Sequence, residues 1–334
     1  QYIVVLNQSS FKSFSTENYE QRMLKVRERA RKMLQECEIS ENAVKNTYGT
    51  ALLGFSANLT KAEVATLKSN PDVKYLVEDR IFTLGIVHLE GKPTPTPPAE
   101  SIPYGILRVG YASGVGKTAW IIDTGIDLDH PDLNVDASRG YDFVNGDAFA
   151  DDDNGHGTHC AGTVAALDNE IGVVGVAYGA TVVPVKVLNR RGSGAYSEII
   201  AGIDFVATNA QPGDAVNMSL GGGVYEPIDE AVYNASQSGI YFSLAAGNES
   251  DDANNHSPAR VNGANIWTIS AMDSNDYWAS FSNYGNPPID FCMPGVNVYS
   301  CYKNGGFATM SGTSMAAPHM CGVLLLTNGN PSSD

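Results

Sequence analysis

Apolar residues in the last two thirds of the chain fall into short runs that alternate with helical patterns. The predominantly apolar runs cover residues 118–123, 181–188, 215–220, 240–246 and 266–272. The segments with an apolar residue at every third or fourth position cover residues 156–167, 197–210 and 228–237. Uninterrupted apolar strands are typical of parallel sheets that are buried on both faces. The alternation therefore predicts an α/β fold with helices on both faces of a parallel sheet.

The first part of the chain has a different pattern. It predicts a small α+β, ferredoxin-like unit with strands at residues 1–7, 43–55 and 73–82 and helices at about 16–36 and 60–70. A run of alternating proline and threonine follows, which is typical of a linker. Because 334 residues exceed what one core usually holds, we expect three parts, at residues 1–92, 93–99 and 100–334.

Charge is divided unevenly between these parts. Residues 1–92 contain 13 basic and 11 acidic residues, and residues 93–334 contain 8 and 26, so the net charges are +2 and −18 and the parts attract each other. The strong acidity argues against nucleic acid as a partner. The chain has no run of 18 apolar residues, the length that a membrane-spanning helix needs. Its first residue, Gln1, begins directly on a strand pattern, as after removal of a signal peptide, so we expect a secreted protein.

Three polar residues lie in local sequence contexts that are typical of catalytic residues. Asp123 ends an apolar strand, His156 lies among glycines, and Ser314 opens an apolar helix after Gly-Thr. A serine hydroxyl needs a neutral imidazole to take its proton and a carboxylate to orient that imidazole. Each residue alone would be read as a turn residue, but the three together predict a catalytic triad. Asn248 ends another apolar run on a side-chain amide, which is the donor that an oxyanion requires.

These motifs resemble the subtilase family of serine endopeptidases, whose triad follows the same Asp, His, Ser order. Within the family, the segments at 155–164, 185–188 and 280–285 are most similar to the proteinase K branch. The resemblance implies a subtilisin-like three-layer fold and peptide-bond hydrolysis through an acyl-enzyme. It also implies a monomer that acts on peptide and protein substrates.

The first part resembles the inhibitory prosegment of the same family, through Tyr-Ile-Val-Val at residue 2 and Gly-Phe-Ser-Ala at residue 54. Such a segment acts as a folding chaperone and as an intramolecular inhibitor whose end occupies the substrate subsites. The alternative is an unrelated accessory domain of ferredoxin-like fold. Self-cleavage is expected between Phe82 and Ala99, because Ser-Ile-Pro-Tyr-Gly at residue 101 resembles the start of mature enzymes.

Glycine-rich segments predict where a substrate would pair by backbone hydrogen bonds. By resemblance, the subsites are bordered by Gly192, Ser193, Gly194, Ser219, Leu220, Gly221, Ala245, Ala246 and Gly247. The last three would form a pocket without charge, which favours a large apolar residue before the cleaved bond. His256 is expected near the floor of this pocket.

Residues 167–173 predict a calcium site, because alternate residues of this loop direct carbonyl or amide oxygens at one point. The loop resembles the high-affinity calcium loop of subtilisin. That resemblance implies the ligands Glu100, Asp132, Leu167, Asn169, Ile171 and Val173, and a second, weaker cation position at Asp290. For the acidic run at residues 151–153 we favour a solvated surface.

The five cysteines give limited information. Cys160 is expected to be a free, buried thiol, and Cys292 with Cys301 is the one pair considered for a disulfide.

Three function classes fit the motifs to different degrees. An inactive binding protein of this fold would normally lack one of the triad residues or Asn248, and none is missing. An esterase with the same triad usually places its serine in Gly-X-Ser-X-Gly and before its partners, the reverse of the order found here. A calcium-dependent endopeptidase made as a zymogen is therefore the expected function.

Overall fold

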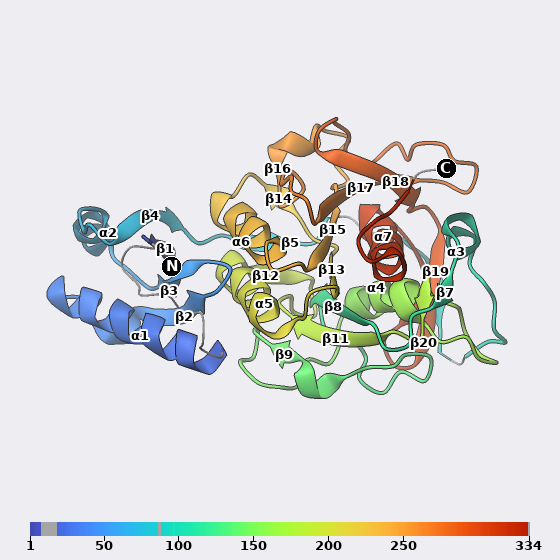
Figure 1. The fold of residues 1–334 in the computed structure, drawn as a ribbon, viewed down its shortest axis with the longest axis horizontal. Coiled ribbons are helices and arrows are strands. Elements are labelled where there is room, and N and C mark those ends of the chain that lie inside the picture. Colours follow the sequence, from blue (N-terminus) through green and yellow to red (C-terminus); the bar gives the residue numbers. More distant parts are fainter. Residues whose placement is uncertain (8–18, 86–87, 96, 333–334) are drawn as a thin grey trace.

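The computed structural model describes residues 1–7, 19–85, 88–95 and 97–332 (Figure 1). Residues 16–18 of the first expected helix and Thr96 of the expected linker lie outside the described residues.

The N-terminal unit is an antiparallel sheet of four strands with two helices, as the sequence predicts. The strands lie in the order β2-β3-β1-β4. The bounds are β1 (Tyr2–Leu6), α1 (Tyr19–Glu36), β2 (Val44–Gly49), β3 (Leu53–Ala57), α2 (Lys61–Lys68) and β4 (Val73–Glu78). Val4 and Leu6 of β1 pack under Met33 of α1, because alternate residues of a strand face the same side.

Two of the expected strands each form two shorter ones. Residues 43–55 fold into the hairpin of β2 and β3, because the backbone N–H groups of the turn bind a carboxylate of the second unit. Residues 73–82 divide after β4, and β5 (Ile81–Thr83) pairs with a strand of the second unit instead. Contacts between the units therefore interrupt the local strand pattern in both places.

The second unit is built on a parallel sheet of seven strands, which confirms the α/β expectation. The strand order is β18-β17-β15-β13-β8-β11-β9. The bounds are β8 (Thr118–Asp123), β9 (Tyr141–Asp142), β11 (Thr181–Lys186), β13 (Ala215–Met218), β15 (Tyr241–Ala245), β17 (Ile266–Met272) and β18 (Ile289–Pro294). The central strands are almost fully buried, which explains why most of their residues are apolar.

Helices cover both faces of this sheet (Figure 1). On β8, Ala119 and Ile121 belong to the core shared with α4 (His156–Ala165) and α7 (Thr313–Thr327). Trp120 and Ile122 belong to the core shared with α5 (Tyr196–Asn209) and α6 (Glu226–Ser236). The second core also contains Ile3, Val5, Tyr48, Ala51 and Leu52 of the N-terminal unit, so that this unit is packed onto α5 and α6.

Part of the expected linker is a strand. Residues 93 and 94 end β6 (His88–Thr94), which pairs with β20 (Gly306–Ser311), and β20 in turn pairs with β19 (Val298–Tyr302). The remaining elements are short: α3 (Tyr104–Val109), β7 (Ala112–Ser113), β10 (Ala177–Tyr178), β12 (Ser193–Ala195), β14 (Gly222–Gly223), β16 (His256–Ser257) and the 3₁₀ helices Glu41–Ala43, Ala137–Arg139 and Ala253–Asn255.

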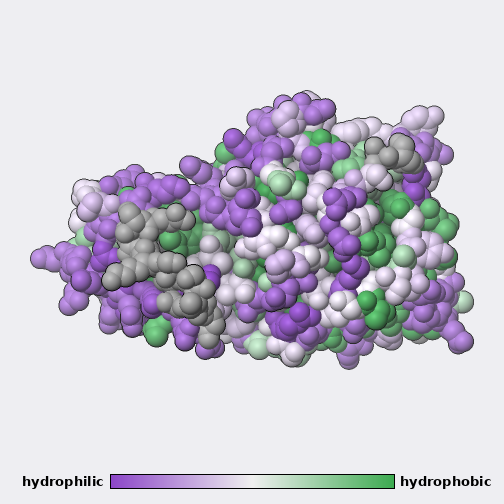
Figure 2. Space-filling view, viewed as in Figure 1, coloured by the Kyte–Doolittle hydropathy of each residue, from purple (hydrophilic) through white to green (hydrophobic). Residues whose placement is uncertain are grey.

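Among the described residues, no helix has both the length and the apolar composition needed to cross a membrane. The face shown in Figure 2 mixes hydrophilic and hydrophobic side chains, and its polar colour is most continuous toward the N-terminal unit.

Candidate active site

Asp123 and His156 are brought together where β8 ends and α4 begins. Nδ1 of His156 lies 2.8 and 2.9 Å from the two carboxylate oxygens of Asp123, and both side chains are buried. The helix approaches closely because residue 157 is glycine: a Cβ there would lie 2.1 Å from the carbonyl oxygen of Gly125. Among the described residues, Nε2 of His156 has no hydrogen-bond partner, which leaves it available to accept a proton.

The charge of the pair determines how His156 titrates. Burial lowers the pKa of His156, but the charge of Asp123 and the hydrogen bond to it outweigh burial and hold the pKa above its ordinary value of 6.5. The imidazole is therefore more basic than that of a free histidine, and it acts as a base in its neutral form, above this pKa.

Ser314 is the second residue of α7, at the positive end of the helix dipole. Its Oγ donates to the carbonyl of Ser219 at 3.1 Å, and Oγ of Ser219 donates to the carbonyl of Ser314 at 2.7 Å. Sγ of Cys160, a free and buried thiol as expected, lies 3.5 Å from the same carbonyl. The nucleophile is thus held between the sheet edge and α4.

The amide of Asn248 is oriented by a residue that the sequence analysis missed. Oδ1 of Asn248 accepts hydrogen bonds from the backbone N–H of Thr313 at 2.8 Å and from its hydroxyl at 3.0 Å. The Nδ2 donor is therefore left for the cleft, 3.9 Å from where a Cβ on Gly85 would stand. Threonine directly before the serine was the signal available in the sequence.

A second missed residue is Asp152, which the sequence analysis placed on a solvated surface. It is buried, and it accepts hydrogen bonds from the hydroxyls of Thr124 and Thr158 at 2.9 and 2.6 Å. It also accepts from the backbone N–H of Gly155 at 2.8 Å. Burial raises the pKa of Asp152, and these hydrogen bonds counteract it. Asp152 joins the residue after Asp123 to the residue before His156, which fixes the two catalytic segments relative to each other.

The end of the N-terminal unit lies in the predicted subsites. Residues 81–83 pair antiparallel with residues 193–195, and the N–H of Leu84 donates to the carbonyl of Gly192 at 2.8 Å. Phe82, Leu84 and Gly85 share one pocket with Ser219, Leu220, Gly221, Ala245, Gly247, Asn248, Glu249, Thr313 and Ser314. Ala246 is buried behind this pocket, its N–H bound to the carbonyl of Ile269.

The pocket contains a charge that was not expected. Glu249 lines it, with Oε1 3.9 Å from the position of a Cβ on Gly85, and Oε2 accepts a hydrogen bond from Nδ2 of Asn283 at 2.7 Å. His256 lies beside this carboxylate, 3.6 Å from it, and 3.2 Å from Asp251. Leu220, Ala245 and Gly247 line this pocket together with polar residues and the carboxylate of Glu249.

The side chains of Glu100, Asp132 and Asn169 form one hydrogen-bonded cluster with the N–H groups of the loop at residues 167–173. Asn169 donates from Nδ2 to Asp132 at 2.9 Å, and its Oδ1 accepts from the N–H of Ile171 at 2.7 Å. The carboxylate of Glu100 accepts a hydrogen bond from the N–H of Asn169, and the carboxylate of Asp132 accepts one from the N–H of Val173. The backbone carbonyl of Asp132 accepts a hydrogen bond from the N–H of Leu167. Asp290 lies apart on β18 and accepts from the N–H of Thr268 at 2.8 Å.

The charge of this cluster fits a cation. Burial, with a smaller contribution from the charge of Glu100, raises the pKa of Asp132 to about 6. In the described part of the chain, neither carboxylate forms an ion pair with a lysine or arginine. Two carboxylates, an amide and the carbonyls of one loop are the hard oxygen donors that Ca²⁺ takes.

Contacts between the units centre on Asp204 of α5. Its carboxylate accepts from the backbone N–H groups of Gly49, Thr50 and Ala51 at 3.0, 2.7 and 2.7 Å. Burial raises the pKa of Asp204 to about 6, and these donors counteract it. Asp79 caps the start of α5 through the N–H of Ser197. A carboxylate on a helix face had no recognisable signal in the sequence.

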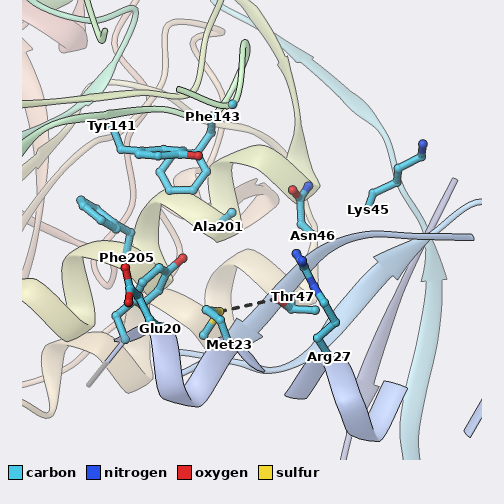
Figure 3. A pocket seen from close by; sticks show the side chains of 12 residues that line it. Glu20, Met23, Arg27, Lys45, Asn46, Thr47, Tyr141, Phe143, Ala201 and Phe205 are labelled. Carbon is cyan, nitrogen blue, oxygen red and sulfur yellow. Dashed lines mark hydrogen bonds between the residues drawn. The ribbon is translucent and has the colours of Figure 1, made fainter. Parts of the chain in front are cut away.

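A hollow between the units lies away from the catalytic residues. Aromatic side chains of the second unit, Tyr141, Phe143 and Phe205, face Met23 and Arg27 of α1 across it (Figure 3). It belongs to the contact between the two units. The cysteines considered for a disulfide, Cys292 and Cys301, are both free.

Comparison with known proteins agrees with this geometry. Residues 116–333 match the subtilase family of peptidases, and residues 1–85 match the peptidase inhibitor I9 family. An alkaline serine exoprotease A of Vibrio alginolyticus is 39% identical over 338 residues, which are 97% of this chain and 60% of that protein. An extracellular serine proteinase of a Thermus species is 39% identical over 295 residues, 85% of this chain and 68% of that protein.

The crystal structure of a cold-adapted subtilisin-like serine proteinase matches with a TM-score of 0.62 and 42% identity, over 68% of this chain and 84% of that one. Proteinase K-type enzymes are also among the relatives. The chain belongs to the subtilase family of serine proteases, and an I9-type inhibitor segment precedes the catalytic unit. It spans 60% of the length of the Vibrio relative.

The raised pKa of His156 predicts the pH dependence of catalysis. Protonation below this pKa removes the base, so the acid limb of kcat/KM should have an apparent pKa above 6.5. Asp123→Asn should move that limb to lower pH and reduce kcat by roughly 10⁴. Rates of p-nitroanilide hydrolysis from pH 5 to 10 measure both. An acid limb below 6.5 in the unaltered enzyme would contradict this assignment.

The Asp204 contacts predict how firmly the N-terminal unit is held. Asp204→Ala leaves buried N–H groups without an acceptor and should weaken the contact by roughly tenfold or more. The lag before full activity should shorten, which a time course of substrate hydrolysis measures. Asn209→Ala, at an exposed position of the same helix, is the matched control. Equal lags in the two variants would remove Asp204 from this role.

Proposed function

We propose that the chain is the zymogen of a secreted serine endopeptidase that cleaves itself and is then held by its own N-terminal unit. The observation that carries this proposal is the pairing of β5 with β12, which leads Gly85 into the pocket of Ser314 and Asn248. Extended backbone pairing is how a protease grips features that all peptides share. The N-terminal unit is thus the first substrate of the catalytic unit, and after cleavage it is a product-like inhibitor.

The proposed reaction gives each side chain one role, and it requires the Ser314 hydroxyl to turn from the carbonyl of Ser219 to Nε2 of His156. Ser314 attacks the carbonyl carbon while Nε2 of His156 takes its proton, and Asp123 stabilises the imidazolium. Nδ2 of Asn248 and the N–H of Ser314 at the helix start stabilise the oxyanion. His156 then protonates the leaving amine, and water hydrolyses the acyl-enzyme.

Specificity is proposed to rest on the pocket beside Gly85. Leu220, Ala245 and Gly247 give apolar walls, which favour a large apolar residue before the cleaved bond. Glu249 adds a carboxylate that is about half exposed, so it should also tolerate a basic residue there.

The location and partners are part of the same proposal. Secretion is supported by the name of the Thermus relative, an extracellular proteinase. The proposed partners are peptide and protein substrates and the intramolecular N-terminal unit, and the enzyme acts as a monomer. We place the boundary between the inhibitor segment and the enzyme after Gly85. Residues 1–85 match the inhibitor family, and residues 81–83 at their end pair with the predicted substrate-binding strand β12.

Calcium is the proposed cofactor. Asp132, Glu100 and Asn169, with the carbonyls of Leu167, Ile171 and Val173, would hold it. A bound Ca²⁺ neutralises the two carboxylates and stabilises the loop. It takes no part in the proposed chemistry at Ser314. Asp290 remains proposed as a weaker, separate position.

The nucleophile can be tested directly. Ser314→Ala should leave the chain uncut and abolish peptide hydrolysis, a loss on the order of 10⁶ in kcat that is already established for subtilisin in this family. Mass spectrometry of the chain and assays on peptides with Phe, Lys or Asp before the cleaved bond measure both effects. Cys292→Ala is a control outside the site. If both variants hydrolysed peptides equally, the protease proposal would fail.

Removal of calcium should destabilise the processed enzyme. A ligand present at 100 to 1,000 times its Kd stabilises by about 3–4 kcal/mol, so EDTA should lower Tm by roughly 6–16 °C, and added Ca²⁺ should restore it. Asn169→Ala should lose this response. Asp168→Asn, an exposed neighbour in the same loop, should keep it. Calorimetry that shows the same response in both variants would place the site elsewhere.

A further inference from the structure

Strand β6 follows the inhibitor segment and lies beside the nucleophile. It runs antiparallel to β20, with Leu89 opposite Met310 and Glu90 opposite Thr309. The backbone of His88 is opposite Ser311, three residues before Ser314. The strand that leads into the nucleophilic helix is therefore covered along its edge by a segment of the same chain.

Segments of the same chain, before and after residues 86–87, which lie outside the described residues, occupy the two sides of the cleft. Residues 81–83 pair with β12, Gly85 lies in the pocket of Ser314, and pairing resumes on β20 at residue 88. A peptide bound for cleavage runs through a cleft in one direction. Its half before the cleaved bond would follow β12, and its half after that bond would follow β20 in the place of β6.

We propose that β6 is a second inhibitory strand, which occupies the edge of β20 that the C-terminal half of a peptide substrate must use. This inference rests on the proposed protease function. Hydrolysis at the Gly85 carbonyl breaks its bond to the next nitrogen and adds water, leaving a carboxylate on Gly85 and an amine on the following residue. The first 85 residues can then dissociate, whereas β6 stays covalently attached to the enzyme.

Backbone hydrogen bonds fix the chain to the second unit a few residues after β6. Beyond the strand, the carbonyl of Pro98 accepts from the N–H of Gly172, and the N–H of Ser101 donates to the carbonyl of Gly172. The segment is thus tied both to the nucleophilic strand and to the predicted calcium loop. A short tether keeps a segment at an effective concentration in the millimolar range, so β6 competes with substrate without leaving the molecule.

The strand is held in a way that permits displacement. Leu89 is 43% exposed, and Glu90, Gly91 and Lys92 are exposed as well. Backbone hydrogen bonds therefore provide most of its attachment, and they are the same bonds that a substrate would make. The inhibition should be partial, and it should act on substrates that extend past the cleaved bond.

The test compares two substrates with identical residues up to the cleaved bond. One ends in p-nitroanilide, and the other continues for five residues. The double variant Leu89→Pro with Glu90→Pro removes two backbone donors from β6, and Leu89→Ala with Glu90→Ala removes the same side chains but keeps the donors. After self-processing, the proline variant should raise kcat/KM for the long peptide by about three- to tenfold and change p-nitroanilide hydrolysis by less than about twofold. The alanine variant should resemble the unaltered enzyme.

Several results would overturn the proposal. For the proline variant, these are an unchanged kcat/KM on the long peptide, an equal rise in kcat/KM on both substrates, or a fall on both. The last result would mean that β6 supports the structure of β20. Intact-mass measurement supplies a further one: an enzyme that begins after Thr94 as soon as the inhibitor segment is cut would carry no β6. The protease function itself is judged separately, by Ser314-dependent hydrolysis of the p-nitroanilide.

Discussion

The buried hydrogen bond between Asp123 and His156 is the interaction on which the rest of the structure depends. A carboxylate without exposure to water is costly unless its charge is compensated. The end of a central parallel strand and the start of α4 supply that compensation, and Asp152 holds the two segments in register. Ser314 and Asn248 are then positioned at the same edge, where β13, β15 and α7 meet.

The peptide chain itself defines how this edge is used. An antiparallel pairing places the end of the N-terminal unit along β12, and Leu84 extends it by one more backbone hydrogen bond. Because these bonds involve only backbone groups, they fix the course of a bound peptide and place little constraint on its amino-acid sequence. The cleft is therefore suited to many peptides, and the same property lets a segment of the chain occupy it as an inhibitor.

Contacts outside the cleft also hold the N-terminal inhibitor segment on the second unit. Ile3, Val5 and Tyr48 enter the core formed on α5 and α6, and Asp204 receives the N–H groups of the β2–β3 turn. These contacts bury both apolar surface and a carboxylate that would be solvated after release. The opposite net charges of the two parts act in the same direction at long range.

The sequence by itself determined the layers of the fold, the triad candidates and the candidate ligands of the predicted calcium loop. These depend on local patterns: strand and helix periodicity, glycines beside polar residues, and the spacing within one loop. The tertiary structure alone decided the roles of Asp152, Thr313, Glu249 and Asp204, the division of two expected strands, and the pairing of part of the proline-rich segment with β20. Each of these depends on a partner distant in the sequence. A carboxylate becomes buried, or a proline-rich segment becomes a strand, only when folding brings a donor or a free strand edge next to it.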